Sequence, residues 1–185
     1  MESKLCEAKN ILIFKVDTLS AKEIGELCQA AKETIANNMS FSLGFNYANI
    51  PEEELLRRYF LGALLVPERE QFICKLNNVV AGYLELLRPS NNQVTKKFSA
   101  EVTNHFVAPW ARESGIAKKM LIFAEYTAKK NGISVLKLAV RDSLVEAKNL
   151  YTNSGYHQWG SCDKYEKIGD QYMTGHFFYK ELEDV

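Results

Sequence analysis

Cysteine and histidine are scarce in this sequence, and their spacing does not match a metal site. The 185 residues include four cysteines and three histidines. The cysteines lie far apart and form no C-x-x-C pair; they are Cys6, Cys28, Cys74 and Cys162. A structural zinc site needs four suitably spaced cysteine or histidine ligands. We therefore predict no metal site, and we expect free thiols in a reducing compartment.

Long hydrophobic runs and an excess of charge are also missing. The longest apolar candidate, residues 61–66, is far shorter than the ~18 residues that a membrane-spanning helix requires. The first apolar run, residues 11–14, is too short for the core of a signal peptide. Lysine plus arginine (23) balance aspartate plus glutamate (23), so no net charge attracts nucleic acid or an anionic membrane. These absences predict a cytoplasmic protein without nucleic-acid or membrane partners.

Proline-rich and low-complexity segments are absent, and the composition is that of a packed domain. The chain has four prolines, 46% hydrophobic residues and 25% charged residues. Such values are typical of a folded soluble protein and argue against long disorder. A chain of 185 residues can bury one sizeable core but is too short for two ordinary domains. We predict a single domain over residues 1–185.

Turn residues and apolar periodicity predict the elements of the first half. Ser20 and Glu23 form a capping-box pattern that opens a helix ending near residues 37–38. Pro51 and the carboxylates after it mark a second helix, which we expect to end near Leu65. The expected strands are residues 11–16, 71–76, 79–87 and 98–107, with a hairpin turn at residues 77–78 and a polar loop at 88–97.

The second half alternates between helical and extended patterns. An apolar face predicts a helix from Ile116 to about residue 130, followed by a strand at residues 135–140. Residues 143–146 form a second capping-box pattern, and Gly155 is expected to end the helix that follows. Residues 156–161 and 172–182 are expected strands that flank a polar connection.

The most informative stretch joins the strand that ends at Val107 to the helix that opens at Ile116. Gly115 and Ala117 keep side-chain bulk away from the start of this helix. Successive backbone N–H groups there can face an anion, which the helix dipole also favours. The alternative is that Gly115 only relieves a tight turn between strand and helix. The stretch therefore favours a pyrophosphate site but does not establish one alone.

Two motifs that occur in order resemble the GNAT superfamily of acyl-CoA-dependent N-acetyltransferases. R-x-x-G-x-A at residues 112–117 is similar to the family's acyl-CoA loop, arginine/glutamine-x-x-glycine-x-glycine/alanine. A-x-x-L-Y-x-x-x-G-Y at residues 147–156 follows after a helix and a strand, as in the family. The resemblance covers about residues 79–180. The first seventy residues match only in the order of their elements.

The resemblance implies a fold and an activity. The fold is α/β (α+β), with a mixed, mostly antiparallel sheet of six to seven strands, about four helices on its faces and a splayed central strand pair that holds acyl-CoA. Residues 1–78 would be a variable acceptor-side part, and residues 79–180 an acyl-CoA-binding core. The implied reaction moves an acetyl group from the co-substrate acetyl-CoA to a primary amine by direct attack in a ternary complex, without a metal.

The resemblance also implies residues that bind acyl-CoA. The pantetheine arm would lie along the strand backbone near His105, Phe106 and Val107. The pyrophosphate would lie on backbone amides of the loop, whose residues are Arg112, Glu113, Ser114, Gly115, Ile116 and Ala117. Lys118 is close enough to add positive charge, although it could equally be ordinary helix surface. Glu113 and Leu144 stand where relatives often carry a small residue and an asparagine, which bears on CoA affinity.

Three residues are candidates for catalysis. Glu101 stands where several family members carry a general base, which the reaction needs because an alkylamine has a pKa of about 10. His105 is an alternative base by side-chain type, and strand alternation predicts that it shares a face with Glu101. Tyr151 matches the tyrosine that protonates the departing CoA thiolate in many relatives. The alternatives are a solvent-facing role for Glu101 and a packing role for Tyr151; Tyr156 is expected in the core.

Other functions and acceptors remain open at this point. A non-catalytic acyl-CoA-binding regulator would keep the loop without depending on Glu101 or Tyr151. A dinucleotide-binding domain is disfavoured because its first close glycine is missing. Neutral charge slightly favours a small-molecule amine over a protein amine as acceptor, and the protein could be a monomer or a homodimer. Residues that would border an acceptor cleft, or else be core and helix-dipole partners, are Phe41, Phe45, Tyr47, Tyr59 and Glu52 to Glu54.

Overall fold

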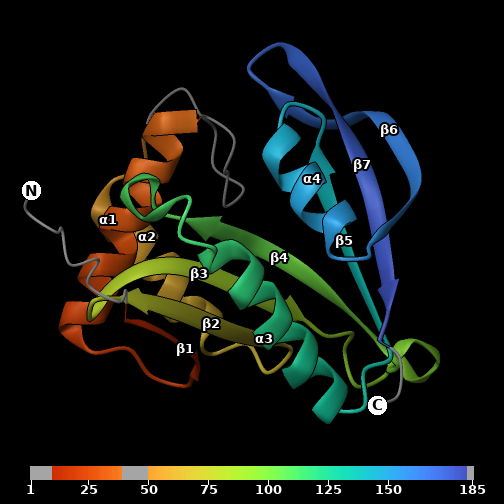
Figure 1. Ribbon diagram of the computed structural model, residues 1–185, viewed down its shortest axis with the longest axis horizontal. Coiled ribbons are helices and arrows are strands. Elements are labelled where there is room, and N and C mark those ends of the chain that lie inside the picture. The colour runs from red at the N-terminus through yellow and green to blue at the C-terminus, as the bar shows by residue number, and fades with distance from the viewer. Residues whose placement is uncertain (1–9, 39–49, 183–185) are drawn as a thin grey trace, which may run out of the picture.

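A seven-stranded sheet with helices on both faces forms the protein in the computed structural model, which describes residues 10–38 and 50–182 (Figure 1). The strands are β1 (Ile11–Val16), β2 (Arg69–Leu76), β3 (Val79–Leu87), β4 (Ser99–Val107), β5 (Val135–Arg141), β6 (His157–Ile168) and β7 (Gln171–Glu181). The α-helices are α1 (Ala21–Asn38), α2 (Glu53–Ala63), α3 (Ile116–Lys130) and α4 (Val145–Asn153). Short 3-10 turns lie at Val94–Lys96 and Pro109–Ala111. The predicted fold class is confirmed.

The strand order places the one parallel pair of the described sheet near its centre. The order is β1-β2-β3-β4-β5-β7-β6, and β4 runs parallel to β5 while the other neighbours are antiparallel. Only residues 99–101 of β4 pair with β5, at residues 135–137. Beyond these three pairs the two strands diverge (Figure 1). The predicted splay of the central strand pair is therefore present.

Each face of the sheet has its own hydrophobic core. On one face, α3 contributes Met120 to a cluster with Leu84 of β3, and α4 lies on the same side (Figure 1). On the other face, Leu27 of α1 and Phe60 of α2 pack with Tyr83 of β3. Successive residues of β3 thus enter opposite cores, as strand alternation requires. Both cores meet at β3 and β4, in the middle of the molecule.

Gly82 allows α3 to lie close to the sheet. A Cβ atom at this position would lie 2.8 Å from Met120 Sδ and 3.2 Å from the carbonyl oxygen of Phe106. A Cβ atom at 2.8 Å would force the Met120 side chain to move, and the backbone at Phe106 would have to shift by a few tenths of an ångström. This contact fixes the beginning of α3 beside the end of β4.

One predicted helix cap is confirmed and the other is wrong. The Ser20 amide donates to Glu23 Oε2 at 2.8 Å, and the Glu23 amide donates to Ser20 Oγ at 3.3 Å. Hydrogen bonds from Lys75 and Ser20 lower the pKa of Glu23 to about 2. The N-cap of α4 is Leu144, which makes no side-chain cap. The predicted capping box at 143–146 fails because the turn places Leu144, one residue later, at the N-cap.

One predicted boundary is also wrong, although helix α2 ends at Ala63, close to its predicted end near Leu65. The polar segment predicted to connect the last strands is itself part of β6, which continues to Ile168 before a turn at residues 169–170. Most of β6 is exposed because it is an edge strand. Polar side chains therefore suit it, and polarity alone did not indicate a loop.

Candidate active site

The loop between β4 and α3 presents unpaired amides at the start of a helix. Glu113 and Gly115 both have left-handed backbone conformations, with φ of 59° and 75°. Gly115 is the N-cap of α3 and offers no side-chain cap, and the first helical hydrogen bond runs from the Lys119 amide to the Gly115 carbonyl at 3.1 Å. The Arg112 amide donates to the Pro109 carbonyl at 3.4 Å, whereas within the described residues no backbone hydrogen bond engages the amides of residues 113–118. This geometry suits a pyrophosphate.

The side chains of the loop lie around these amides. Ser114 Oγ donates to the Ala111 carbonyl and closes the loop on itself. Arg112, Glu113 and Lys118 are exposed. The left-handed backbone at Glu113 is costly for a residue with a Cβ.

A β-bulge in β4 reverses its side-chain alternation. Thr103 pairs with Glu85 and Phe106 pairs with Tyr83, so two residues of β4, Asn104 and His105, oppose one residue of β3. Asn104 has a left-handed φ of 50°. The extra residue turns His105 toward α3 and α4, whereas residues before the bulge keep the opposite parity.

Glu101 and His105 therefore lie on opposite faces of the sheet, and the prediction that they share a face is wrong. Thr103 Oγ1 donates to Glu85 Oε2 on the face covered by α1 and α2, and Glu101 has the same parity as Thr103. His105 contacts Tyr151 of α4 on the other face. An asparagine inside a strand was the sequence signal of the bulge, since asparagine is depleted in strands and tolerates this backbone.

The half-buried His105 and the buried Tyr151 form a pair. His105 Nδ1 lies 3.2 Å from Tyr151 Oη. Burial lowers the pKa of His105 to about 4, an effect that the backbone of Ala117 partly opposes, so the imidazole is neutral at pH 7. Burial also raises the pKa of the Tyr151 phenol. Within the described residues, His105 Nε2 has no hydrogen-bond partner.

Aromatic rings fix the other side of Tyr151. The rings of Tyr156 and Phe178 lie with centroids 5.8 and 6.5 Å from that of Tyr151. Tyr156 is buried in the core, as predicted. Tyr151 is thus held by apolar packing on one side and by an imidazole on the other, at the face where α3 begins.

Glu101 lies where β4 and β5 begin to diverge. It pairs in register with Lys137 at the last of the three parallel positions. Its side chain remains exposed, but partial burial makes the charged form less favourable and raises the pKa of its carboxyl group. The positive charge of Lys137 opposes this effect. A carboxylate at this point is accessible and more basic than usual.

A buried polar network lies on the face of α1 and α2, and the sequence reasoning missed it. Glu85 is 1% exposed and accepts hydrogen bonds from the Tyr83 hydroxyl and from Asn104 Nδ2, the latter at 2.9 Å. Arg69 Nη1 lies 3.6 Å from Glu85 Oε2. Asn104 Nδ2 also lies 2.6 Å from the Tyr59 hydroxyl. A carboxylate within the apolar run of β3 was the available signal.

The residues predicted to border an acceptor cleft divide into three groups. Phe41, Phe45 and Tyr47 lie outside the described residues. Tyr59 belongs to the network around Glu85. The carboxylates of Glu53 and Glu54 form ion pairs one helical turn away, each at 3.0 Å, with Arg57 and Arg58. Glu52 is the N-cap of α2, and Glu53 and Glu54 lie in its first turn, which is the position that the helix-dipole alternative predicted.

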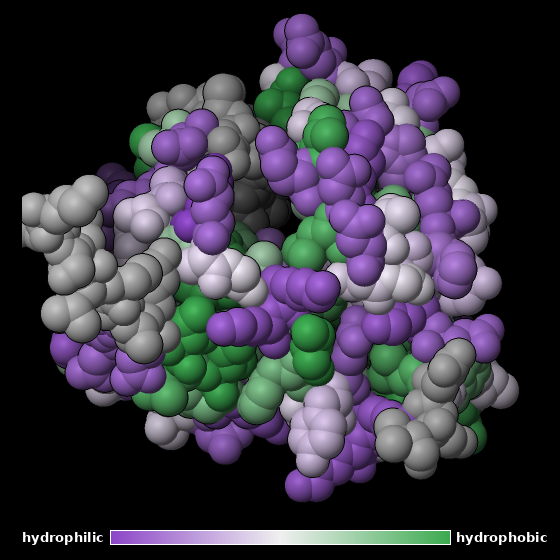
Figure 2. Space-filling model, viewed as in Figure 1, coloured by the Kyte–Doolittle hydropathy of each residue, from purple (hydrophilic) through white to green (hydrophobic). Residues whose placement is uncertain are grey.

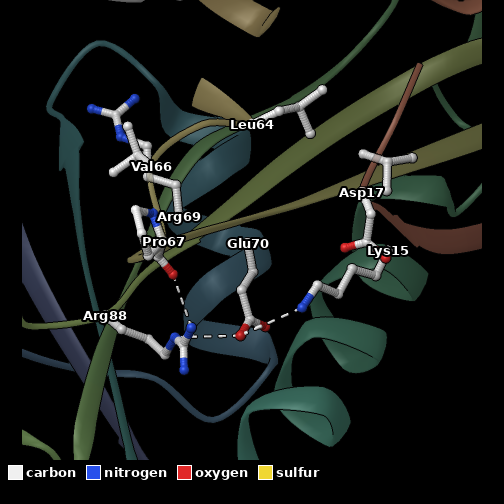
Figure 3. Close-up of a pocket in the computed structure, with 9 residues that line it drawn as sticks. Lys15, Asp17, Leu64, Val66, Pro67, Arg69, Glu70 and Arg88 are labelled. Atoms are coloured by element: carbon white, nitrogen blue, oxygen red, sulfur yellow. Dashed lines mark hydrogen bonds and ion pairs between the residues drawn. The ribbon is translucent and has the colours of Figure 1, made fainter. Parts of the chain in front are cut away.

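A cavity of about 220 Å³ lies away from these residues, beside β1 and the start of β2 (Figure 3). Glu70 in its wall lies 3.6 Å from Lys15 Nζ and 3.3 Å from Arg88 Nε. Arg88 Nη2 also donates to the Pro67 carbonyl at 3.0 Å. Lys15, Glu70 and Arg88 in its wall pair with one another, and no predicted site residue lines it.

The surface is hollowed between the part formed by α1 to β4 and the part formed by β5 to β7, and hydrophilic side chains border the hollow (Figure 2). In the described ranges, no cluster of three potential metal ligands is present. None of the described helices is long and apolar enough to cross a membrane.

Comparison with known proteins agrees with this geometry. The sequence model of the acetyltransferase (GNAT) family matches residues 36–156. A protein of Azospirillum brasilense named an uncharacterized N-acetyltransferase is 34% identical over 134 residues, which cover 72% of this chain and 77% of that protein. The chain belongs to the GNAT family of acetyltransferases.

Solved structures share the fold at low sequence identity. An acetyltransferase from Salmonella typhimurium, solved with its cofactor acetyl-CoA, has a TM-score of 0.73 at 12% identity, covering 95% of this chain and 96% of that one. The ribosomal L7/L12 α-N-protein acetyltransferase RimL, solved with coenzyme A, has a TM-score of 0.77 at 12% identity, covering 92% and 93%. At this identity the likeness concerns the fold alone.

Proposed function

We propose that the protein is an N-acetyltransferase that moves the acetyl group of acetyl-CoA to a primary amine by direct attack in a ternary complex. The observation that carries this proposal is the uncapped start of α3, which follows the end of β4 that has no pairing with β5. The Salmonella structural neighbour has acetyl-CoA as its cofactor, which supports the same co-substrate here.

The chain offers matching groups for both ends of the co-substrate. Amides of residues 113–117 are the proposed donors to the pyrophosphate, since the Arg112 amide already donates to the Pro109 carbonyl, and Lys118 adds positive charge. Beyond Glu101, β4 has no pairing with β5, and the pantetheine arm is proposed to lie on that side of β4, near Phe106 and Val107. Gly115 has nothing within 4 Å of an added Cβ, so the space above the loop is open.

Glu101 is the proposed general base, acting directly or through water. Its raised pKa makes it a better proton acceptor, and its side chain is exposed at the opening. His105 suits this role less, because burial holds its pKa at about 4 and it faces away from Glu101. Tyr151 is the proposed acid that protonates the departing sulfur.

The acceptor class is a small-molecule amine, with a protein amino group as the rival. The balance of 23 positive and 23 negative residues provides no strong field for a charged protein partner. RimL acts on a ribosomal protein, so the test includes both kinds of acceptor.

The experiment combines ligand-dependent stability with an acetyl-transfer assay. Acetyl-CoA at ~100 times its Kd should stabilise the fold by about 2.7 kcal/mol, which raises Tm by roughly 5–11 °C. Gly115→Glu should abolish this rise. Gly132→Glu is the matched control, since Gly132 has a similar φ of 79°, an equally open Cβ position and lies at the far end of α3.

The outcomes separate the candidates. Acetylation of polyamines, amino acids or peptide amino termini, lost in Glu101→Gln, supports the enzyme. A Tm rise without transfer to any amine supports the non-catalytic regulator. No rise at millimolar acetyl-CoA contradicts the proposed function.

A further inference from the structure

His105 and Tyr151 come from separate elements and are brought together by the bulge in β4. His105 Nδ1 lies 3.2 Å from Tyr151 Oη, and the ring centroids lie 6.1 Å apart. Without the extra residue at Asn104, His105 would point toward α1 and α2, away from α4. A specific backbone irregularity therefore creates this contact.

The hydrogen bond to His105 is the one that the described residues provide for the side chain of Tyr151. Its other neighbours are the rings of Tyr156 and Phe178. Burial raises the pKa of the Tyr151 phenol, which makes it a weaker acid. A hydrogen bond donated to the phenol oxygen stabilises the phenolate and opposes this effect.

The neutral imidazole of His105 carries one N–H, on either Nδ1 or Nε2. With the proton on Nδ1, it donates to Tyr151 Oη and leaves the phenol O–H free to point elsewhere. With the proton on Nε2, the phenol proton is directed at His105, and the buried N–H makes no hydrogen bond of ordinary geometry among the described residues, although the backbone of Ala117 lies near enough to raise the pKa of the ring. An unpaired buried donor is rarer and costlier than an unpaired acceptor, so the first tautomer is favoured.

We propose that His105 is a positioning residue for Tyr151, whose phenol oxygen it holds through Nδ1–H while the phenol proton stays free for the departing sulfur. This inference rests on the proposed N-acetyltransferase function. Tyr151 gives its proton to sulfur as the carbon–sulfur bond breaks and the nitrogen–carbon bond forms. Glu101 takes the proton that the amine loses, and water returns a proton to Tyr151. His105 stays neutral throughout.

Kinetics on four variants tests the positioning role. His105→Leu should lower kcat 10- to 100-fold with little change in the KM for acetyl-CoA, less than the loss of the general acid in Tyr151→Phe. His105→Asn should recover kcat to within about fivefold, because its amide N–H can replace Nδ1–H. In the Tyr151→Phe background, His105→Leu should add no further loss. His157→Leu, at an exposed position, is the control.

A second arm needs no turnover. Nitrogen-15 NMR of labelled histidine should show the His105 proton on Nδ1 and no titration between pH 8 and 5. The His105 signals are assigned by their absence in His105→Asn. This measurement reads the hydrogen bond directly and also shows whether each variant is folded.

Each result decides between the inference and its failure. Wild-type kcat in His105→Leu, additive losses in the double variant, or a proton on Nε2 would overturn it. Loss of the rescue by His105→Asn, in a folded protein, would also contradict it. If the wild-type protein acetylates no amine, the proposed function fails while the NMR tautomer still decides the hydrogen bond.

Discussion

The two faces of β4 differ in how completely their buried polar groups are hydrogen-bonded. On the face of α1 and α2, Glu85 has Tyr83, Asn104 and Arg69 around it. On the face of α3 and α4, His105 and Tyr151 share one hydrogen bond, and Nε2 of His105 has no partner among the described residues. A satisfied network stabilises one arrangement, whereas an incomplete one keeps polar atoms available to a substrate. The network on the first face therefore stabilises the bulge through Asn104, and on the second face the bulge brings His105 into contact with Tyr151.

The largest stability effect should come from the satisfied face. Glu85→Gln removes the buried charge that faces Arg69 and leaves Asn104 facing an amide, which we expect to cost about 3 kcal/mol. Thermal unfolding should show Tm lower by roughly 6–12 °C. Glu181→Gln, at an exposed end of β7, should change stability by no more than about 0.5 kcal/mol. Equal Tm values for the two variants would remove the contrast between the faces.

On the face of α3 and α4, His105 should make the stability of the protein depend on pH. The folded pKa of His105, about 4, lies below its ordinary 6.5, so the unfolded chain binds a proton in this window and the folded one does not. Stability should therefore fall as pH falls from about 6.5 to 4. This effect should lower the free energy of unfolding by about 2 kcal/mol at pH 5 relative to pH 8, and His105→Leu should abolish that difference. Urea unfolding at the two pH values measures it, and an unchanged pH slope would count against a buried neutral imidazole.

The smallest effect concerns strain in the loop on the same face. Glu113→Gly should stabilise the protein by about 1 kcal/mol, because glycine adopts the left-handed backbone without a Cβ clash. It should also lower the Kd for acetyl-CoA in calorimetry, since one negative charge near the pyrophosphate is lost. Asn78→Gly is the control, because asparagine at φ 66° tolerates this backbone and should yield only a few tenths of a kcal/mol. A gain in Asn78→Gly as large as in Glu113→Gly would show that the loop carries no special strain.

Local signals were sufficient to predict most of the fold. The capping box at Ser20 and the turn at residues 77–78 depend on neighbouring residues, and both form as predicted. The extent of β6 depends on pairing with β7 at the edge of the sheet, which its polar composition does not reveal. Local sequence patterns therefore predicted which helices and strands form. They did not predict where β6 ends, because pairing with β7 determines that.

The candidate site was less predictable for the same reason. The loop at residues 112–117 is contiguous and could be found as a motif. The contact between His105 and Tyr151 depends on one extra residue in β4, and strand alternation gave the wrong face for His105. The network of Glu85 joins β2, β3, β4 and α2, so only the three-dimensional structure reveals it.

The three-residue seam between β4 and β5 has a consequence for folding. Strands β1 to β4 pair by antiparallel contacts within the first part of the chain, and β5, β6 and β7 form a second paired group. Few backbone hydrogen bonds cross from one group to the other. Amide hydrogen exchange should therefore divide the sheet into two cooperative units, with the seam exchanging before either interior. The opening that we propose for acyl-CoA therefore begins at the least protected place in the middle of the sheet.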